Sequence, residues 1–112
     1  MSTRTPPRLQ GLPTAAVLGH EVPVATGIRC RLLGLAWLDR CEAGAGLLIP
    51  RCASVHTFGM RFALDLYFLG EAGAVLLVCH RIPPRRVVSC RAARATLEIP
   101  SSEGGEFSTT RA

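Results

Sequence analysis

The sequence predicts a mostly β domain of the α+β class, with about six or seven short strands and one main helix. Apolar residues make up 48% of the 112 positions, which is enough to supply one core. They fall into short runs separated by 11 Gly and 8 Pro residues, a pattern typical of short strands joined by turns. Only residues 27–40 space their apolar side chains as a helix does.

One folded domain is expected over residues 14–100. Residues 1–13 are rich in Pro and Arg and contain no apolar stretch that could act as a signal peptide, so we expect a flexible arm and a cytoplasmic protein. Residues 101–112 are polar and predict a mobile tail. No apolar run is long enough to cross a membrane, so no membrane partner is expected.

The first predicted elements are a hairpin and the main helix. Two short apolar runs flank Gly19-His20 within residues 15–26, which predicts a hairpin with an exposed histidine at its tip. The helix is predicted within residues 27–40, with Thr26 as its N-cap. Gly34 lowers the stability of a helix by about 1 kcal/mol relative to Ala, so we expect it to pack closely against a sheet. The apolar residues predicted to share one helix face are Ile28, Leu32, Leu35, Trp37 and Leu38.

Five further strands are predicted along the rest of the chain. In residues 62–69, four apolar residues alternate with Asp65 and Tyr67, so the two sets are expected on opposite faces of a strand. A four-residue turn leads from this strand into the next one and makes a hairpin. Residues 51–60 are expected to be irregular. The predicted strands are residues 46–50, 62–69, 74–82, 85–90 and 95–100.

Four segments, in order along the chain, carry a resemblance to a known family. In the third segment Leu64-Asp65 stands where the family has P-L-D, with Ala63 at the proline position. The four segments are Ala25-Thr26 with Arg31 and Gly34-Leu35, Gly46–Ile49, His56–Phe68, and Leu97–Pro100. Together they resemble the uncharacterised family called Domain of Unknown Function 192, and the match covers most of the chain.

The resemblance implies a compact β-sandwich or barrel-like domain. It implies no activity, cofactor or catalytic group, because none is established for the family. The chain departs from the family pattern at residues 56–59, where the family has an aromatic-Met-Lys-Asn run. It departs again after Pro100, where a polar tail replaces the closing strand of the family, so an edge of the sheet is expected to lie uncovered.

Two carboxylates, Asp65 and Glu98, interrupt apolar strands. Burying an ionised carboxylate costs several kcal/mol unless it is paired and hydrogen-bonded, so each is expected to have a specific role. One interpretation is that they form a pair, or join His56, in a pocket for acid–base chemistry or ligand binding. We favour the structural interpretation, in which an arginine forms an ion pair with each of them. The candidate arginines are Arg31, Arg51 and Arg61.

His56 lies in the irregular segment and is the candidate catalytic or ligand-binding histidine. We favour the alternative that backbone carbonyls at a turn satisfy its ring. Cys52 stands four residues earlier, so a thiol–imidazole pair is a further option. The chain has five cysteines, an odd number with no C-x-x-C spacing, so we expect reduced thiols, no metal site and no cofactor.

The net charge of +5 is the difference between 13 basic residues, all of them Arg, and 8 acidic residues. The densest basic stretch is residues 80–94, and its candidate anion-binding residues are Arg81, Arg85, Arg86, Arg91 and Arg94. No aromatic residue stands between these arginines, so a platform for base stacking is missing from the stretch. The chain also lacks Lys and Asn, which suggests a GC-rich genome that enriches Arg without regard to function.

Three functional hypotheses stay open. The first is a non-enzymatic module that binds a small ligand or another protein. The second is a small hydrolase-like enzyme that uses Asp65 and His56. The third is an arginine-dependent binder of nucleic acid or other anions. An open pocket in which Asp65 and His56 converge would indicate the enzyme, and a contiguous patch of the five arginines would indicate the anion binder.

Overall fold

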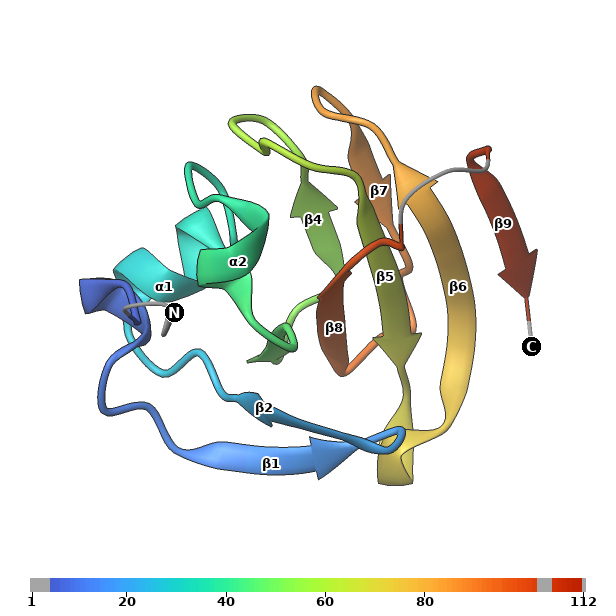
Figure 1. Ribbon diagram of the computed structural model, residues 1–112. Coiled ribbons are helices and arrows are strands. Elements are labelled where there is room, and N and C mark those ends of the chain that lie inside the picture. Colours follow the sequence, from blue (N-terminus) through green and yellow to red (C-terminus); the bar gives the residue numbers. More distant parts are fainter. Residues whose placement is uncertain (1–4, 103–105, 112) are drawn as a thin grey trace.

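Nine strands and four short helical segments make up the described part of the chain, residues 5–102 and 106–111 of the computed structural model (Figure 1). No helix among these residues is long and apolar enough to cross a membrane. The predicted mostly β class is confirmed. The helical segments are η1 (Pro7–Leu9), α1 (Ile28–Leu33), α2 (Arg40–Ala43) and η2 (Glu71–Gly73). The strands are β1 (Thr14–Val17), β2 (His20–Pro23), β3 (Leu47–Pro50), β4 (Ser54–His56), β5 (Leu64–Leu69), β6 (Val75–Ile82), β7 (Val87–Ser89), β8 (Ala95–Pro100) and β9 (Ser108–Arg111).

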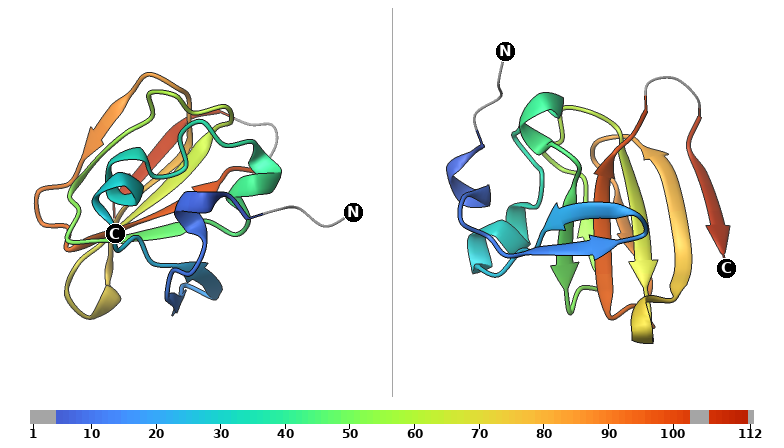
Figure 2. Two further views of the ribbon diagram at one scale, coloured as in Figure 1. Left: turned by 90° about the vertical axis from the view of Figure 1, so that its left-hand side faces the viewer. Right: turned by 60° about the horizontal axis from the view of Figure 1, so that its bottom comes forward.

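A five-stranded antiparallel sheet with the strand order β3-β8-β5-β6-β9 forms the centre of the fold. The β1–β2 hairpin lies across one end of this sheet, and the two short helices lie beside it (Figures 1 and 2). The short β4–β7 pair contributes Val55 and Val88 to the main core. The described strands form an open arrangement, not a closed barrel.

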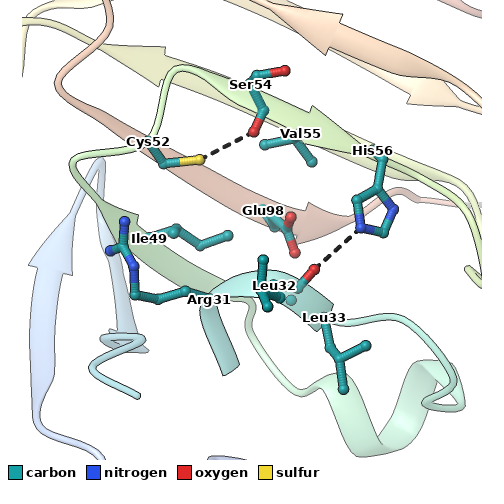
Figure 3. Close-up of a pocket in the computed structure, with 10 residues that line it drawn as sticks. Arg31, Leu32, Leu33, Ile49, Cys52, Ser54, Val55, His56 and Glu98 are labelled. Carbon is teal, nitrogen blue, oxygen red and sulfur yellow. Dashed lines mark hydrogen bonds between the residues drawn. The ribbon is translucent and has the colours of Figure 1, made fainter. Parts of the chain in front are cut away.

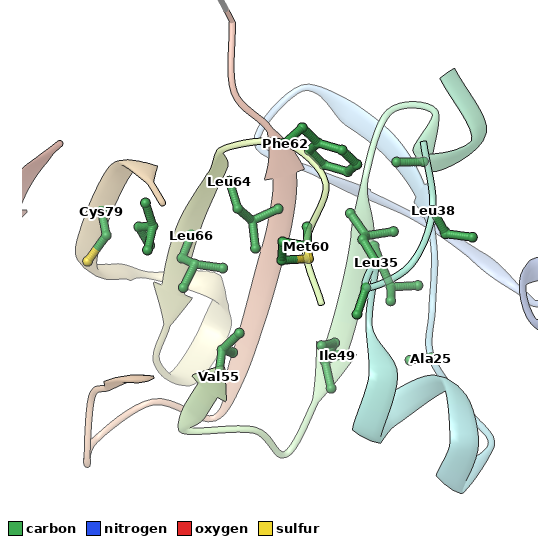
Figure 4. Packing of buried hydrophobic residues seen from close by; sticks show 14 of the residues in the cluster. Ala25, Leu35, Leu38, Ile49, Val55, Met60, Phe62, Leu64, Leu66 and Cys79 are labelled. Carbon is green, nitrogen blue, oxygen red and sulfur yellow. The ribbon is translucent and has the colours of Figure 1, made fainter. Parts of the chain in front are cut away.

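The main core lies on one face of the central sheet (Figure 4). Successive side chains of a strand point to opposite faces, and Leu64, Leu66 and Phe68 of β5 are fully buried together, as the alternating pattern predicted. A smaller cluster around Val22 and Leu97 packs under the hairpin on the other face. This alternation decides which face of the sheet each charged residue occupies.

The main helix is shorter than predicted. The helix begins after Gly27, which occupies the N-cap position without a side-chain cap. The prediction that Thr26 is the N-cap is therefore wrong. It ends at Gly34, whose φ of +54° takes the chain out of the helix, and α2 follows as a separate turn. The five apolar residues do not share one buried face, because Leu35 and Leu38 enter the core beyond this break. Ile28, Leu32 and Trp37 are instead exposed to solvent.

Two strands were not predicted from the sequence. Strand β4 lies in the segment expected to be irregular, and it pairs with β7. Strand β9 lies in the polar tail and pairs with β6, so the edge of β6 is covered and not bare as expected. Polar, exposed residues in β9 carry no hydrophobic alternation, which explains why the pattern gave no signal.

The described part of the N-terminal segment packs against the domain. Leu9 is buried in the main core, and the Arg8 guanidinium donates hydrogen bonds to the carbonyls of Gly34 and Ala36. Residues 7–9 form η1, so part of the segment expected to be a flexible arm lies against the domain. Residues 1–4, and 103–105 and 112 of the tail, lie outside the described residues.

Candidate functional site

A cavity of about 110 Å³ lies between α1, β3, β4 and β8 (Figure 3). Its inner wall contains the buried side chains of Ile49, Val55 and Glu98, and its rim contains the exposed Leu32 and His56. Since a water molecule occupies roughly 30 Å³ of liquid, the space corresponds to about three or four waters or one small polar group. The cavity therefore has an ionisable carboxyl at its base, apolar walls and an opening to solvent.

Glu98 is the central group of this cavity. Only 3% of the residue is exposed, and Figure 3 shows its carboxyl pointing into the space between α1 and β4. Oε1 accepts a hydrogen bond from the Leu35 N–H at 3.2 Å. Burial raises the pKa of Glu98 to about 7, although the Leu35 N–H and the charge of Arg8 both act to lower it. Near neutral pH the carboxyl can therefore act as a hydrogen-bond donor or as an acceptor.

Two glycines make room for Glu98. A Cβ on Gly34 would lie 2.6 Å from Glu98 Oε1, and a Cβ on Gly46 would overlap the Glu98 carbonyl oxygen. Both glycines also have positive φ, which other residues adopt only with strain. The close packing expected at Gly34 is therefore present, and its neighbour is a carboxyl of the sheet.

Arg31 lines the cavity but does not pair with either carboxylate. Its guanidinium donates hydrogen bonds to the carbonyls of Pro50 and Arg51, the latter at 3.2 Å. These bonds join the end of α1 to the end of β3. Arg31 therefore orients the helix over the cavity while Glu98 keeps no ion-pair partner among the described residues.

His56 and Cys52 complete the polar lining. The distance between His56 Nε2 and the Leu32 carbonyl is 3.1 Å, and because a carbonyl only accepts, Nε2 is the protonated nitrogen in this bond. Cys52 Sγ donates to the Ser54 carbonyl at 3.3 Å. The backbone carbonyl expected for His56 is thus present, yet the ring also borders the cavity that contains a carboxyl.

The family model of DUF192, described as an uncharacterized ACR, matches residues 13–109 of this sequence. The chain belongs to the DUF192 family. Among solved structures, a crystal structure of a protein of unknown function from Novosphingobium aromaticivorans is similar, with a TM-score of 0.65 and 16% sequence identity. The match covers 96% of this chain and 91% of that one, and at this identity it shows the fold alone. No curated protein matches the sequence.

All four segments that carry the DUF192 resemblance contribute to the surroundings of the cavity. Arg31 and Gly34 come from the first segment, Ile49 from the second, His56 from the third and Glu98 from the fourth. These segments are separated by up to 67 positions in the sequence, between Arg31 and Glu98. The fold therefore gathers the motif residues around one cavity.

Asp65 lies outside this cavity, on the opposite face of the sheet from Glu98. Glu98 stands opposite Leu66 in the β5–β8 register and faces the main core, whereas Asp65 points the other way. The structure therefore does not bring Asp65 together with Glu98 or with His56. None of the candidate arginines of Asp65 pairs with it through its side chain among the described contacts.

The partners of Asp65 are different from those predicted. Oδ1 accepts hydrogen bonds from the backbone N–H of Arg81, at 2.8 Å, and from the hydroxyl of Ser101. Oδ2 lies 3.4 Å from Nδ1 of His80. The register of β5 and β6 shifts at this point, so His80 and Arg81 together stand opposite Asp65 in a β-bulge, and Arg81 has a φ of +57°. Asp65 therefore holds the bulge and links β5 to β6 and to Ser101, the residue that follows β8.

His80 was not singled out from the sequence as a partner of Asp65. Its ring packs edge-on against Tyr67, with 6.1 Å between the ring centroids. The signal that could have found the contact is the hairpin of residues 62–82, because an antiparallel hairpin places residues near 65 beside residues near 80. The bulge shifts that register by one residue, and nothing in the local pattern indicates it.

The remaining candidate arginines lie on several different elements. Arg61 pairs with Asp39 at 3.0 Å and Arg94 with Glu71 at 3.3 Å, all at the surface, where such pairs contribute little stability. Arg51 lies beside Arg94, since the Arg51 N–H donates to the Arg94 carbonyl. In the basic stretch, strand β7 separates the group Arg85 and Arg86 from the group Arg91 and Arg94, and Arg81 lies in β6.

Among the described residues, no three His, Cys, Asp or Glu side chains are grouped so that they could hold a metal ion.

Proposed function

We propose that this DUF192 chain is a non-enzymatic binding module that holds a small polar ligand, or the polar end of a larger one, in the cavity beneath α1. The observation that carries the proposal is the buried Glu98 carboxyl, which has no ion-pair partner among the described residues and lies at the base of a cavity with an exposed rim. Ligand sites commonly combine apolar walls with a few polar groups that fix orientation. The five free cysteines support a reducing compartment such as the cytoplasm for this function.

The chemistry of the cavity favours a ligand that exchanges hydrogen bonds with a carboxyl near its pKa. Glu98 supplies either a donor or an acceptor, and Leu33, Ile49 and Val55 supply apolar contact. The Nδ1 of His56 supplies an acceptor at the rim while Nε2 stays bonded to Leu32. The volume restricts the enclosed part of the ligand to a few non-hydrogen atoms.

A hydrolase-like enzyme is the second candidate, and its residues differ from the pair proposed on the sequence. His56 shares the cavity with Glu98, not with Asp65. A general base must reach the proton that it removes, and His56 Nε2 already donates to the Leu32 carbonyl. No hydrogen bond joins His56 to Glu98 or to Cys52 among the described contacts. We therefore place binding ahead of catalysis.

Thermal denaturation with small probes tests the binding function. The probes are acetate, acetamide and methylamine, each of which presents one polar group small enough for the cavity, followed by metabolites that carry the group that binds. A ligand of the folded state raises the melting temperature by mass action. The increase should be smaller for Glu98→Gln than for the wild type, whereas Glu71→Gln, a change at an exposed glutamate, should behave like the wild type.

Alkylation of Cys52 gives a second readout that does not depend on stability. Its half-buried thiol lines the cavity, so a bound probe should slow its reaction with iodoacetamide. The exposed Cys41 lies outside the cavity lining and should react at an unchanged rate. Unchanged melting temperature and unchanged Cys52 alkylation with every probe would refute the proposal.

A further inference from the structure

Five large apolar side chains lie on the surface beside the rim of the cavity: Ile28, Leu32, Trp37, Phe58 and Val87. Their exposed fractions range from 52% to 78%. Single exposed apolar residues are ordinary, but a contiguous group of them indicates an interaction site. We call these five residues the apolar face.

Contacts between neighbouring segments link the residues of the apolar face. Ile28 and Leu32 are one turn apart on α1, and the Leu32 carbonyl bonds to the ring of His56. That ring lies 5.9 Å from the ring of Phe58, and His56 is the register partner of Val87 in the β4–β7 pair. Figure 3 shows Leu32 and His56 beside each other at the edge of the cavity.

Trp37 joins the face through Gly59. The Trp37 N–H donates to the Gly59 carbonyl at 2.8 Å, and a Cβ on Gly59 would lie 2.8 Å from the indole ring. Gly59 directly follows Phe58, so Trp37 lies against the turn that carries Phe58. Three separate segments therefore build one apolar area around His56.

Arginines border the apolar face on two sides. Arg29 stands next to Ile28 and shares a surface groove with Trp37. The backbones of Arg85 and Arg86 are bonded to Thr57, between His56 and Phe58. None of these three arginines has an ion pair among the described residues. The nearby acids are engaged, since Asp39 pairs with Arg61 and Glu42 caps α2.

We propose that the apolar face docks an amphipathic, acidic segment of a different protein. The aliphatic and aromatic side chains would bury the apolar stripe of the partner, and the arginines would pair with acidic groups at its margins. A second copy of this chain is a poor occupant, because an isologous contact would place the same unpaired arginines against each other. Single-stranded nucleic acid is a poorer occupant, because only Trp37 and Phe58 of the five residues offer a ring for stacking.

Trp37 provides the readout, since it is the only tryptophan of the chain and is 61% exposed. The probes are two synthetic helical peptides with the same leucine stripe, one flanked by glutamates and the other by lysines, and a short oligothymidylate. The glutamate peptide should shift the Trp37 emission to shorter wavelength and should bind more weakly as salt is added. The lysine peptide should leave the emission unchanged.

Matched variants locate the binding. Phe58→Ala should weaken binding of the glutamate peptide about tenfold, as expected for loss of an aromatic anchor. Phe107→Ala, which removes a similarly exposed phenylalanine outside the face, should have no effect. The double change Arg85→Ala and Arg86→Ala should reduce the salt dependence, and Arg91→Ala with Arg94→Ala should not.

Four outcomes would overturn the proposal. They are no binding of the glutamate peptide, equal binding of both peptides, tighter binding of the oligothymidylate, and self-association detected by sedimentation with burial of Trp37. The first outcome would show that the face does not bind an acidic helix, and the second that charge does not contribute to binding. The last two would assign the face to nucleic acid or to a second copy.

Discussion

Gly34 and Glu98 are packed so closely that a Cβ at position 34 would lie 2.6 Å from Oε1 of the carboxyl. The two residues are 64 positions apart in the sequence. Gly34 ends α1, and its neighbour Leu35 donates the backbone hydrogen bond that Glu98 accepts. The end of the helix and the carboxyl therefore depend on each other for position.

Gly34→Ala should destabilise the protein more than Gly44→Ala. Both glycines end a short helix with nearly the same backbone conformation, with φ of +54° and +60°. Both changes place an alanine at a positive φ, which strains the backbone. Only Gly34→Ala also places a methyl group against Glu98, and such overpacking typically costs about 1–3 kcal/mol. Urea denaturation of the two variants measures the difference. Equal losses would show that the carboxyl is free to move away.

The stability of the protein should contain a pH dependence from Glu98. Its folded pKa of about 7 lies above the ordinary value of 4.5, so the folded state retains a proton that the unfolded state releases. This contribution is fully present below pH 4.5 and is lost as the pH rises to about 7. Its size is on the order of 3 kcal/mol by linkage. The total curve also contains the contributions of all other titratable groups, so it does not isolate that of Glu98.

Glu98→Gln isolates that contribution, because the amide keeps the shape of the side chain and cannot ionise. The stability of the variant relative to the wild type should increase between pH 5 and pH 8. Parallel stability curves for the two proteins over this range would contradict the raised pKa. The measurement is urea denaturation at each pH, followed by circular dichroism.

Asp65→Ala should be much more damaging than Asp65→Asn. Alanine leaves the Arg81 N–H and the Ser101 hydroxyl without an acceptor, at about 1–3 kcal/mol for each buried group. Both donors bond to Oδ1, which the amide of asparagine retains, so Asn should lose only the contact with His80. This differs from an arginine ion pair, in which Asn and Ala would be similarly harmful. Chemical denaturation of both variants decides between the two accounts.

The cysteines should react with iodoacetamide in the order of their exposure. Cys41 is exposed and should react first, whereas Cys30 and Cys79 are buried and burial raises the pKa of both thiols. Mass spectrometry of peptides from the native protein should therefore find Cys41 alkylated, and Cys30 and Cys79 intact until the protein is unfolded. Early modification of Cys79 would indicate that β9 opens from β6, since Thr109 of β9 contacts this thiol.

The sequence was sufficient for the strands whose side chains alternate. In residues 62–69 the alternating apolar residues Phe62, Leu64, Leu66 and Phe68 all belong to the main core, because a strand with one buried face must repeat its apolar residues every second position. Short apolar runs between turn residues located the β1–β2 hairpin and the strands β3, β6, β7 and β8. The motifs in these segments were also sufficient to indicate the DUF192 family.

The exposure of α1 could not be read from its pattern. Ile28 and Leu32 repeat as core residues do, yet both are exposed, and Cys30 is the buried residue of the helix. Whether an apolar stripe is covered depends on what the rest of the chain places over it, and that is not a local property.

The partners of the charged residues were decided only by the tertiary structure. Asp65 and Glu98 look alike in sequence, yet the register of β5 against β8 places them on opposite faces. Because of a one-residue bulge in β6, Asp65 accepts a hydrogen bond from the backbone N–H of Arg81 instead of the expected arginine side chain. Such contacts depend on strand pairing between distant segments, and a shift of one residue changes every partner, so periodicity predicts the strand but not the neighbour that its charge will meet.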